Sequence, residues 1–371
     1  MKFSESRLGW MRVGGLSVIG LSLVLASVAP EADLQKWNQC MTDSTRALKQ
    51  DQLPEAIALC DQAMKLAATF GTNDTHLARS QTLRAEIYIW EKKNDLAEQT
   101  FREAVASCER AAGTNSPDVI HPLSSLANYY YFVVVRYDRV VPLFQRILAI
   151  VESTPGRNDR DVIMWSRNLG LIYQQTGQYA LAEPCFQRAV TLAEKTDAEW
   201  LPHELLTFAE FYRVWGKYDR AEKLATRALS IREKALQSAP GADAQLDLAV
   251  SLDELGAIYL AEGKADRAES CCRRSLETVE KFMSPDQADL VPRLTGLAAA
   301  LRAERQFEPA DQLYRRALSI AEKNVGPNDL QVAELLEKHA ALLQDMKKTA
   351  EAEALLARAG TIRKQNASAT N

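Results

Sequence analysis

A short sequence pattern recurs eight times along this chain at a period near 42 residues, and it constrains the fold more than any other feature. Its clearest copies are Gly170 Leu171 Ile172 Tyr173 with Gly177, Tyr179, Ala182, Phe186 and Ala189, and Gly256 Ala257 Ile258 Tyr259 with Gly263, Ala268, Cys272 and Ser275. Self-similarity at a fixed period indicates a stack of small units, because no single unit can bury its apolar face alone.

The register of the units is defined by an anchor residue that is nearly always small. The anchors, spaced by 41, 43, 42, 39, 47, 42 and 42 residues, are Ala56, Ala97, Val140, Ala182, Ala221, Ala268, Ala310 and Ala352. A filler residue follows each anchor by four positions, at Cys60, Phe101, Phe144, Phe186, Ala225, Cys272, Tyr314 and Leu356. A second small position precedes the anchor by twelve residues, or thirteen in the third unit, at Ser44, Ala85, Ala127, Gly170, Ala209, Gly256, Ala298 and Ala340. Because positions four apart share a helix face and small residues allow close approach, each unit is predicted to be two antiparallel helices joined by a short turn.

This pattern resembles the tetratricopeptide repeat (TPR), and the period resembles the longer repeat of kinesin light chains, since an ordinary TPR has about 34 residues. The surplus lies in linkers such as Gly113 Thr114 Asn115 Ser116 Pro117 Asp118 Val119 and Gly326 Pro327 Asn328 Asp329. There Gly is expected to end one helix in a left-handed cap, and Ser, Asn or Asp to cap the next. The resemblance covers residues 34–363 and implies an all-α TPR superhelix of about eight antiparallel helix pairs, followed by a polar tail at 364–371. The third unit departs from the pattern, with Val133 Val134 Val135 in place of a Gly turn and one extra residue.

Residues 1–33 form a different kind of segment. Lys2, Arg7 and Arg12 precede an apolar stretch at 13–29, and acidic residues follow it. A basic flank before an apolar core predicts an export signal or a single membrane anchor. The repeats are then expected outside the cytoplasm, periplasmic or extracellular, either soluble after cleavage or tethered. The alternative is a buried first helix, but the stretch lacks the repeat pattern.

Composition and motifs narrow the classes of function. A net charge of -4, with no basic stripe interleaved with aromatic residues, argues against nucleic acid as a partner. The sequence has no phosphate-binding loop, nucleophile elbow or metalloprotease motif, so we predict no enzyme activity and no cofactor.

The six cysteines and four histidines show no metal-ligand spacing, so no metal site is predicted. Cys40 and Cys60 stand four residues outside the facing positions Ser44 and Ala56, which makes them a possible disulfide in an oxidising compartment. The alternative is that Cys60 only fills the space between helices, as Cys272 does at the same repeat position.

The family resemblance implies that the first helix of each unit lines an inner groove that binds a protein or peptide. Carried onto the second to fourth units, the groove positions are Arg79, Glu86, Trp90, His121, Asn128, Tyr131, Phe132, Arg167, Asn168, Leu171 and Gln174. The competing interpretation is that Trp90 and Phe132 pack as core. We therefore predict a non-catalytic protein-protein interaction module that binds its partner in the concave groove. The alternative is a structural assembly factor that braces a membrane or envelope complex through edge or end contacts.

Overall fold

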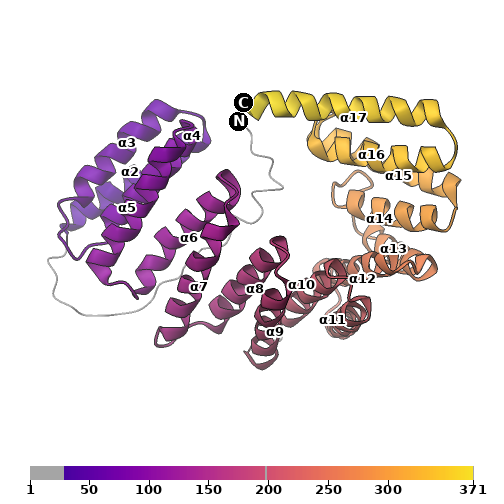
Figure 1. The fold of residues 1–371 in the computed structure, drawn as a ribbon, viewed down its shortest axis with the longest axis horizontal. Coiled ribbons are helices and arrows are strands. Elements are labelled where there is room, and N and C mark those ends of the chain that lie inside the picture. The colour runs from indigo at the N-terminus through magenta and orange to yellow at the C-terminus, as the bar shows by residue number, and fades with distance from the viewer. Residues whose placement is uncertain (1–28, 197–198, 371) are drawn as a thin grey trace. The chain divides into compact units, whose positions relative to one another are not determined.

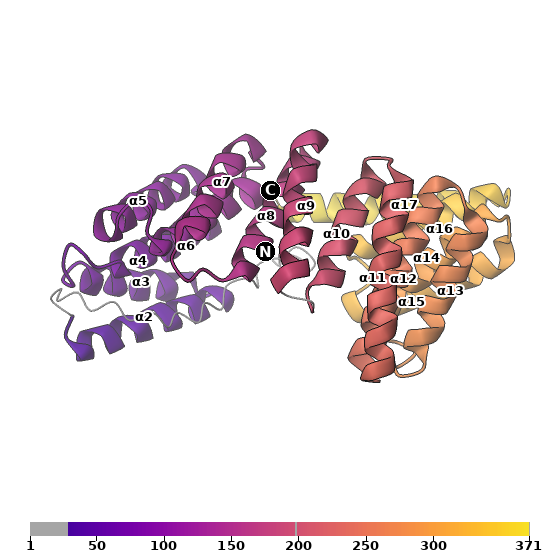
Figure 2. The same cartoon turned by 90° about the horizontal axis from the view of Figure 1, so that it is seen from below.

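A computed structural model of the chain describes residues 29–196 and 199–370, and within these ranges the secondary structure is helical (Figure 1). The described residues fall into two compact units, an amino-terminal unit (residues 29–196) and a carboxyl-terminal unit (residues 199–370). The helix pairs of the amino-terminal unit are α2 (Glu31–Lys49) with α3 (Leu53–Ala67), α4 (His76–Trp90) with α5 (Asn94–Ala112), α6 (Ile120–Asn128) with α7 (Tyr137–Ser153), and α8 (Asp159–Gln175) with α9 (Tyr179–Thr196). A short 3₁₀ helix η2 (Pro117–Val119) precedes α6, and a π-helix η3 (Tyr129–Val133) follows it. The pairs of the carboxyl-terminal unit, seen from a second direction in Figure 2, are α10 (Leu201–Val214) with α11 (Tyr218–Ser238), α12 (Ala242–Glu262) with α13 (Ala265–Glu280), α14 (Leu290–Ala303) with α15 (Phe307–Val325), and α16 (Leu330–Asp345) with α17 (Thr349–Thr370).

The predicted boundaries of the repeat region differ slightly from the helix ends. Residues 31–33 already belong to α2, and residues 364–370 continue α17. The predicted export or anchor segment lies otherwise outside the described residues. Within residues 29–196 and 199–370, every helix is too short or too polar to cross a membrane.

The packing positions predicted from the repeat are buried. All eight anchor residues, from Ala56 to Ala352, are 0% exposed. The two glycines at the second small position show why size matters there. A Cβ at Gly170 would lie 3.0 Å from the ring of Phe186, and a Cβ at Gly256 would lie 2.6 Å from the Sγ of Cys272. The filler of the second helix therefore occupies the space that a small residue on the first helix leaves open.

The turn inside every pair contains one residue with positive φ. These residues are Asp51, Lys92, Val135, Gly177, Gly216, Gly263, Arg305 and Lys347. Each stands five residues before its anchor, so the turns repeat with the same intervals as the helices. Glycine adopts this conformation without the steric cost that a side chain incurs. Val135 has φ 53, and for a β-branched residue that is a strained conformation.

The linkers between pairs behave largely as predicted, with one difference. Ser116, Asn158 and Asp329 each accept a hydrogen bond from the backbone N–H two residues later, as helix caps do. Gly113, with φ 94 and ψ 153, and Gly326, with φ 90 and ψ 156, do not form the left-handed caps that we expected. Both adopt an extended conformation at positive φ that is open essentially only to glycine. The longest interval, of 47 residues, is taken up by helices α11 and α12 of 21 residues each, and the linker between them spans only residues 239–241.

The irregular third unit contains the extra residue within its first helix. In the other seven pairs, the residue after the positive-φ residue donates its N–H to the carbonyl five residues earlier, as Gln178 does to Tyr173. In the third pair Arg136 donates to Tyr130, six residues earlier, across the π-helix η3. A π-turn of this kind is the usual way in which a helix absorbs one added residue.

Candidate functional site

The inner side of the amino-terminal unit is formed by the first helices of its pairs. Helix α2 contacts α4 and α4 contacts α6, whereas contacts between the second helices of successive pairs are weaker. In a curved stack the helices on the concave side lie closest together. The first helices α2, α4 and α6 therefore lie on the inner side, the position that the family resemblance implies.

Two of these helices carry matching pairs of exposed side chains. In α4 the exposed residues are Arg79 and Glu86, and in α6 they are His121 and Asn128. Both pairs are separated by seven residues, two helical turns, so each pair lies on one stripe of its helix. We call these four residues the inner face.

The polar groups of the inner face lack hydrogen-bond and ion-pair partners among the residues that the structure describes. The side chains of all four residues make no hydrogen bond or ion pair with any other described residue. The guanidinium of Arg79 lies over the ring of Trp37, 5.4 Å from its centre. By contrast, arginines of the second helices are paired, with Arg102 2.7 Å from Glu98 and Arg146 2.5 Å from Glu109.

The concave position also changes the titration of two inner-face groups. Although both side chains are exposed, enough protein surrounds them to disfavour charge. The surrounding protein raises the pKa of Glu86 to about 7. Burial, and then the nearby charge of Arg79, lower the pKa of His121, so its imidazole is neutral at neutral pH. Glu86 and His121 are thus partly desolvated groups that remain open to a ligand.

The remaining predicted site residues are less accessible. Trp90 is half-buried and packs against the core cluster of Leu48, Cys60, Leu83 and Ile87, in agreement with the core interpretation. Arg167 is only 8% exposed. Asn168, Leu171 and Gln174 are half-buried on α8, and the buried Oε1 of Gln174 has no hydrogen-bond partner within residues 29–196 and 199–370.

Tyr131 and Phe132 lie in the π-helix η3 and are both half-buried. Their rings meet edge to face at 4.5 Å, and Tyr131 also meets Tyr137 at 5.4 Å. The aromatic pair that we predicted for the groove, Tyr131 and Phe132, therefore belongs to the turn that begins with the π-helix η3, which we call the aromatic turn.

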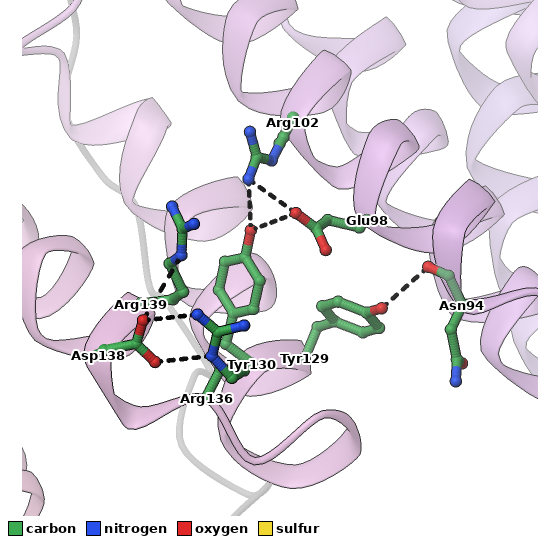
Figure 3. A network of polar contacts seen from close by, with 8 residues as sticks. All are labelled: Asn94, Glu98, Arg102, Tyr129, Tyr130, Arg136, Asp138 and Arg139. Carbon is green, nitrogen blue, oxygen red and sulfur yellow. Dashed lines mark hydrogen bonds and ion pairs between the residues drawn. The ribbon is translucent and has the colours of Figure 1, made fainter.

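Polar contacts to the second helices hold this turn in place (Figure 3). The hydroxyl of Tyr130 donates to Glu98 at 2.8 Å and accepts from Arg102 at 3.0 Å. The hydroxyl of Tyr129 donates to the carbonyl of Asn94 at 2.9 Å. Burial is the main cause that raises the pKa of both phenols, so they stay protonated.

A second accessible surface, which the sequence pattern did not predict, lies at the edge formed by the turns. Leu96, Val135 and Leu181, near the start of the second helices α5, α7 and α9, are 43%, 56% and 49% exposed. We call these three residues the turn edge. The signal was present in the sequence, because Val135 stands where most other turns have Gly or a charged residue.

The cysteines contribute no bridge to either surface. The possible disulfide between Cys40 and Cys60 is not formed in the structure, where both are buried free thiols. The helix register behind it is correct, since the hydroxyl of Ser44 donates to the carbonyl of Ala56 at 2.7 Å. The Sγ of Cys60 lies 3.6 Å from the carbonyl oxygen of Ser80 on the next pair, and burial raises the pKa of Cys60 to about 12. Pairing under oxidising conditions stays a prediction. Among the described residues, no group of three or more His, Cys, Asp and Glu side chains has the arrangement of a metal site.

Comparison with known proteins agrees with this architecture. The tetratricopeptide repeat family matches residues 136–195, 247–323 and 291–365. The chain therefore contains tetratricopeptide repeats. The predicted all-α TPR solenoid is thereby confirmed, and TPR proteins in general are non-catalytic modules that bind other proteins.

Several solved structures are similar to this chain at low sequence identity. A tetratricopeptide repeat protein from Parabacteroides merdae is 16% identical, with 82% of this chain and 99% of that chain covered and a TM-score of 0.51. Aspartyl phosphate phosphatase F from Bacillus subtilis is 12% identical, with 93% and 96% covered and a TM-score of 0.55. TPR-like repeats of a putative kinesin light chain from Podosopora anserina are 21% identical, with 56% and 96% covered and a TM-score of 0.47. No curated protein matches the chain.

Proposed function

We propose that this TPR protein is a non-catalytic interaction module that binds a protein or peptide segment on the inner face of its amino-terminal unit. The observation that supports this proposal is the set of four exposed polar side chains on two adjacent helices that form no hydrogen bond or ion pair with another described residue. Polar groups in a concave, partly desolvated position are satisfied by a ligand that brings complementary donors and acceptors. Asn128 can pair with a peptide backbone, while Arg79 and Glu86 can read side chains.

The test compares partner capture by a variant of the inner face with partner capture by a matched variant of the outer surface. Glu86→Ala, His121→Ala and Asn128→Ala are combined in one variant. Gln99→Ala, Glu103→Ala and Gln187→Ala are combined in a control, since these residues are exposed on the second helices α5 and α9. The inner-face variant should weaken binding of any captured partner by about 2 kcal/mol, the scale of interface hot spots, with unchanged helical content. Equal capture by both variants would place the binding surface elsewhere.

The same proposal includes export, which rests on the sequence of residues 1–33. The basic flank before the apolar stretch favours translocation of the chain after that stretch. The repeats would then meet their partner outside the cytoplasm, with the first segment cleaved or kept as a tether.

A second candidate function is assembly through the turn edge. Three large apolar side chains are exposed on successive pairs, and Val135 is strained where a glycine or a charged residue serves in the other turns. Every turn has a residue with positive φ, so an exposed β-branched residue kept at this position at a cost in strain is an argument for function. Replacing Leu96, Val135 and Leu181 by Ser should abolish any self-association seen by sedimentation and leave inner-face binding unchanged. If the inner-face variant keeps full capture while this variant loses it, assembly through the turn edge becomes the better interpretation.

A further inference from the structure

Glu86 differs from the other inner-face residues because it is the only carboxylate among them. It follows directly after Ala85, which is 0% exposed, and because consecutive helix residues point about 100° apart, Glu86 projects from another side of α4, where it is exposed. Its side chain has no hydrogen bond or ion pair within residues 29–196 or 199–370. No cation among the described residues therefore pairs with the carboxylate of Glu86.

The neighbouring cations are engaged elsewhere. Arg84 lies 3.4 Å from Asp61 and 4.8 Å from the centre of the Tyr88 ring. Arg79 lies over Trp37, and its charge acts on His121 of α6. Seven residues of helix separate Arg79 from Glu86, about 10 Å along the axis, so the two charges meet different positions of a ligand.

The surroundings of Glu86 favour a cation brought by a partner. Protein atoms around the carboxylate disfavour its charged form, and an opposite charge placed beside it reverses that preference. An ion pair in such a partly desolvated position is stronger than one in open water. Asn128, at the equivalent position of the next repeat, offers an amide that can bind the backbone of the same segment.

We propose that the inner face recognises a peptide segment of the partner that carries a basic side chain, lysine or arginine, which pairs with Glu86. This inference rests on the proposed function and specifies the partner of the same site. An acidic side chain at that position would meet the carboxylate of Glu86 and is excluded. The segment lies as extended chain across α4 and α6, with the basic residue next to the backbone group that Asn128 binds.

The experiment selects peptides from a phage-displayed library of random dodecapeptides against the immobilised full chain and against its Glu86→Gln variant. Among peptides selected by the wild type, Lys or Arg should be enriched several-fold at one position of the aligned sequences. The Glu86→Gln pool should lack this enrichment. The substitution is isosteric and exposed, so circular dichroism should show unchanged folding.

A selected peptide then tests the contact directly. Glu86→Gln should weaken its binding about five-fold, as expected for a partly exposed ion pair worth about 1 kcal/mol. Changing the basic residue of the peptide to Glu should weaken binding to the wild type, and Glu86→Lys should restore part of the loss.

The peptide experiments distinguish failure of the basic-segment inference from failure of the proposed inner-face binding. Peptides that lose binding to an Asn128→Ala variant but show no enrichment of Lys or Arg would overturn the basic-segment inference and leave the inner face as a binding site. Selected peptides that bind the inner-face triple variant as well as the wild type would overturn both.

Discussion

The packing of Gly256 against Cys272 makes a prediction that tests the repeat register itself. An added Cβ at Gly256 would lie 2.6 Å from the Sγ of Cys272, about 1 Å closer than atoms in contact normally lie. Overpacking of this kind costs about 1 to 3 kcal/mol, and the higher helix propensity of Ala returns about 1 kcal/mol. Gly256→Ala should therefore lower the free energy of unfolding by about 1 kcal/mol.

The second substitution, Cys272→Ala, removes the atom that the new Cβ would meet. Alone it should cost about 1 kcal/mol, because Cys272 is only 4% exposed and its sulfur leaves a small void. Combined with Gly256→Ala it should be close to neutral, since the new methyl group fills the void. The fifth repeat already contains this Ala–Ala pair, at Ala209 and Ala225, both 0% exposed.

The double-mutant cycle should give a coupling free energy of about 2 kcal/mol, measured by urea unfolding followed by circular dichroism. Gly360→Ala is the control, because a Cβ there has no neighbour within 4 Å and only the propensity gain remains. A double variant as unstable as the sum of the single variants would show that the two positions do not share this space.

Four further outcomes are expected. Tyr130→Phe removes the hydroxyl bonded to Glu98 and should lower the free energy of unfolding by about 1 kcal/mol in thermal or urea unfolding. Val135→Gly removes the strain of a β-branched side chain at positive φ. It should raise the free energy of unfolding by about 0.5 to 1 kcal/mol in the same assay, without changing peptide binding. Binding of a basic peptide, measured by calorimetry, should weaken as pH falls from 8 to 6, since Glu86 with its pKa near 7 gains a proton that binding must remove; Glu86→Gln should show no such loss. A reporter that is active only in the cytoplasm, fused after Asn371, should be silent if the repeats are exported.

The repeat pattern predicted the fold far more completely than the site. All eight anchors are buried, because a small residue at a fixed helical spacing reports the contact within its own pair. The pattern did not predict the low exposure of Trp90 and Arg167, because that exposure depends on side chains of neighbouring repeats, which a helix-face argument does not include. The conformation of the third unit was also beyond the pattern. The extra residue was visible, but only the backbone shows that it is absorbed in a π-helix rather than in the turn.

The constant turn spacing has a consequence for how this chain can change in length. The positive-φ residue stands five residues before the anchor in every pair, while the stretches on the far side of the pairs differ by several residues. An insertion at the turn side displaces a buried contact in the second helix of that pair, unless a π-helix absorbs it as in the third pair. An insertion near residues 239–241, in the linker between α11 and α12, leaves the buried contacts within the two flanking pairs in place. Insertions and deletions are therefore tolerated most readily in the linkers between pairs, where new loops and new binding surfaces can arise without loss of the fold.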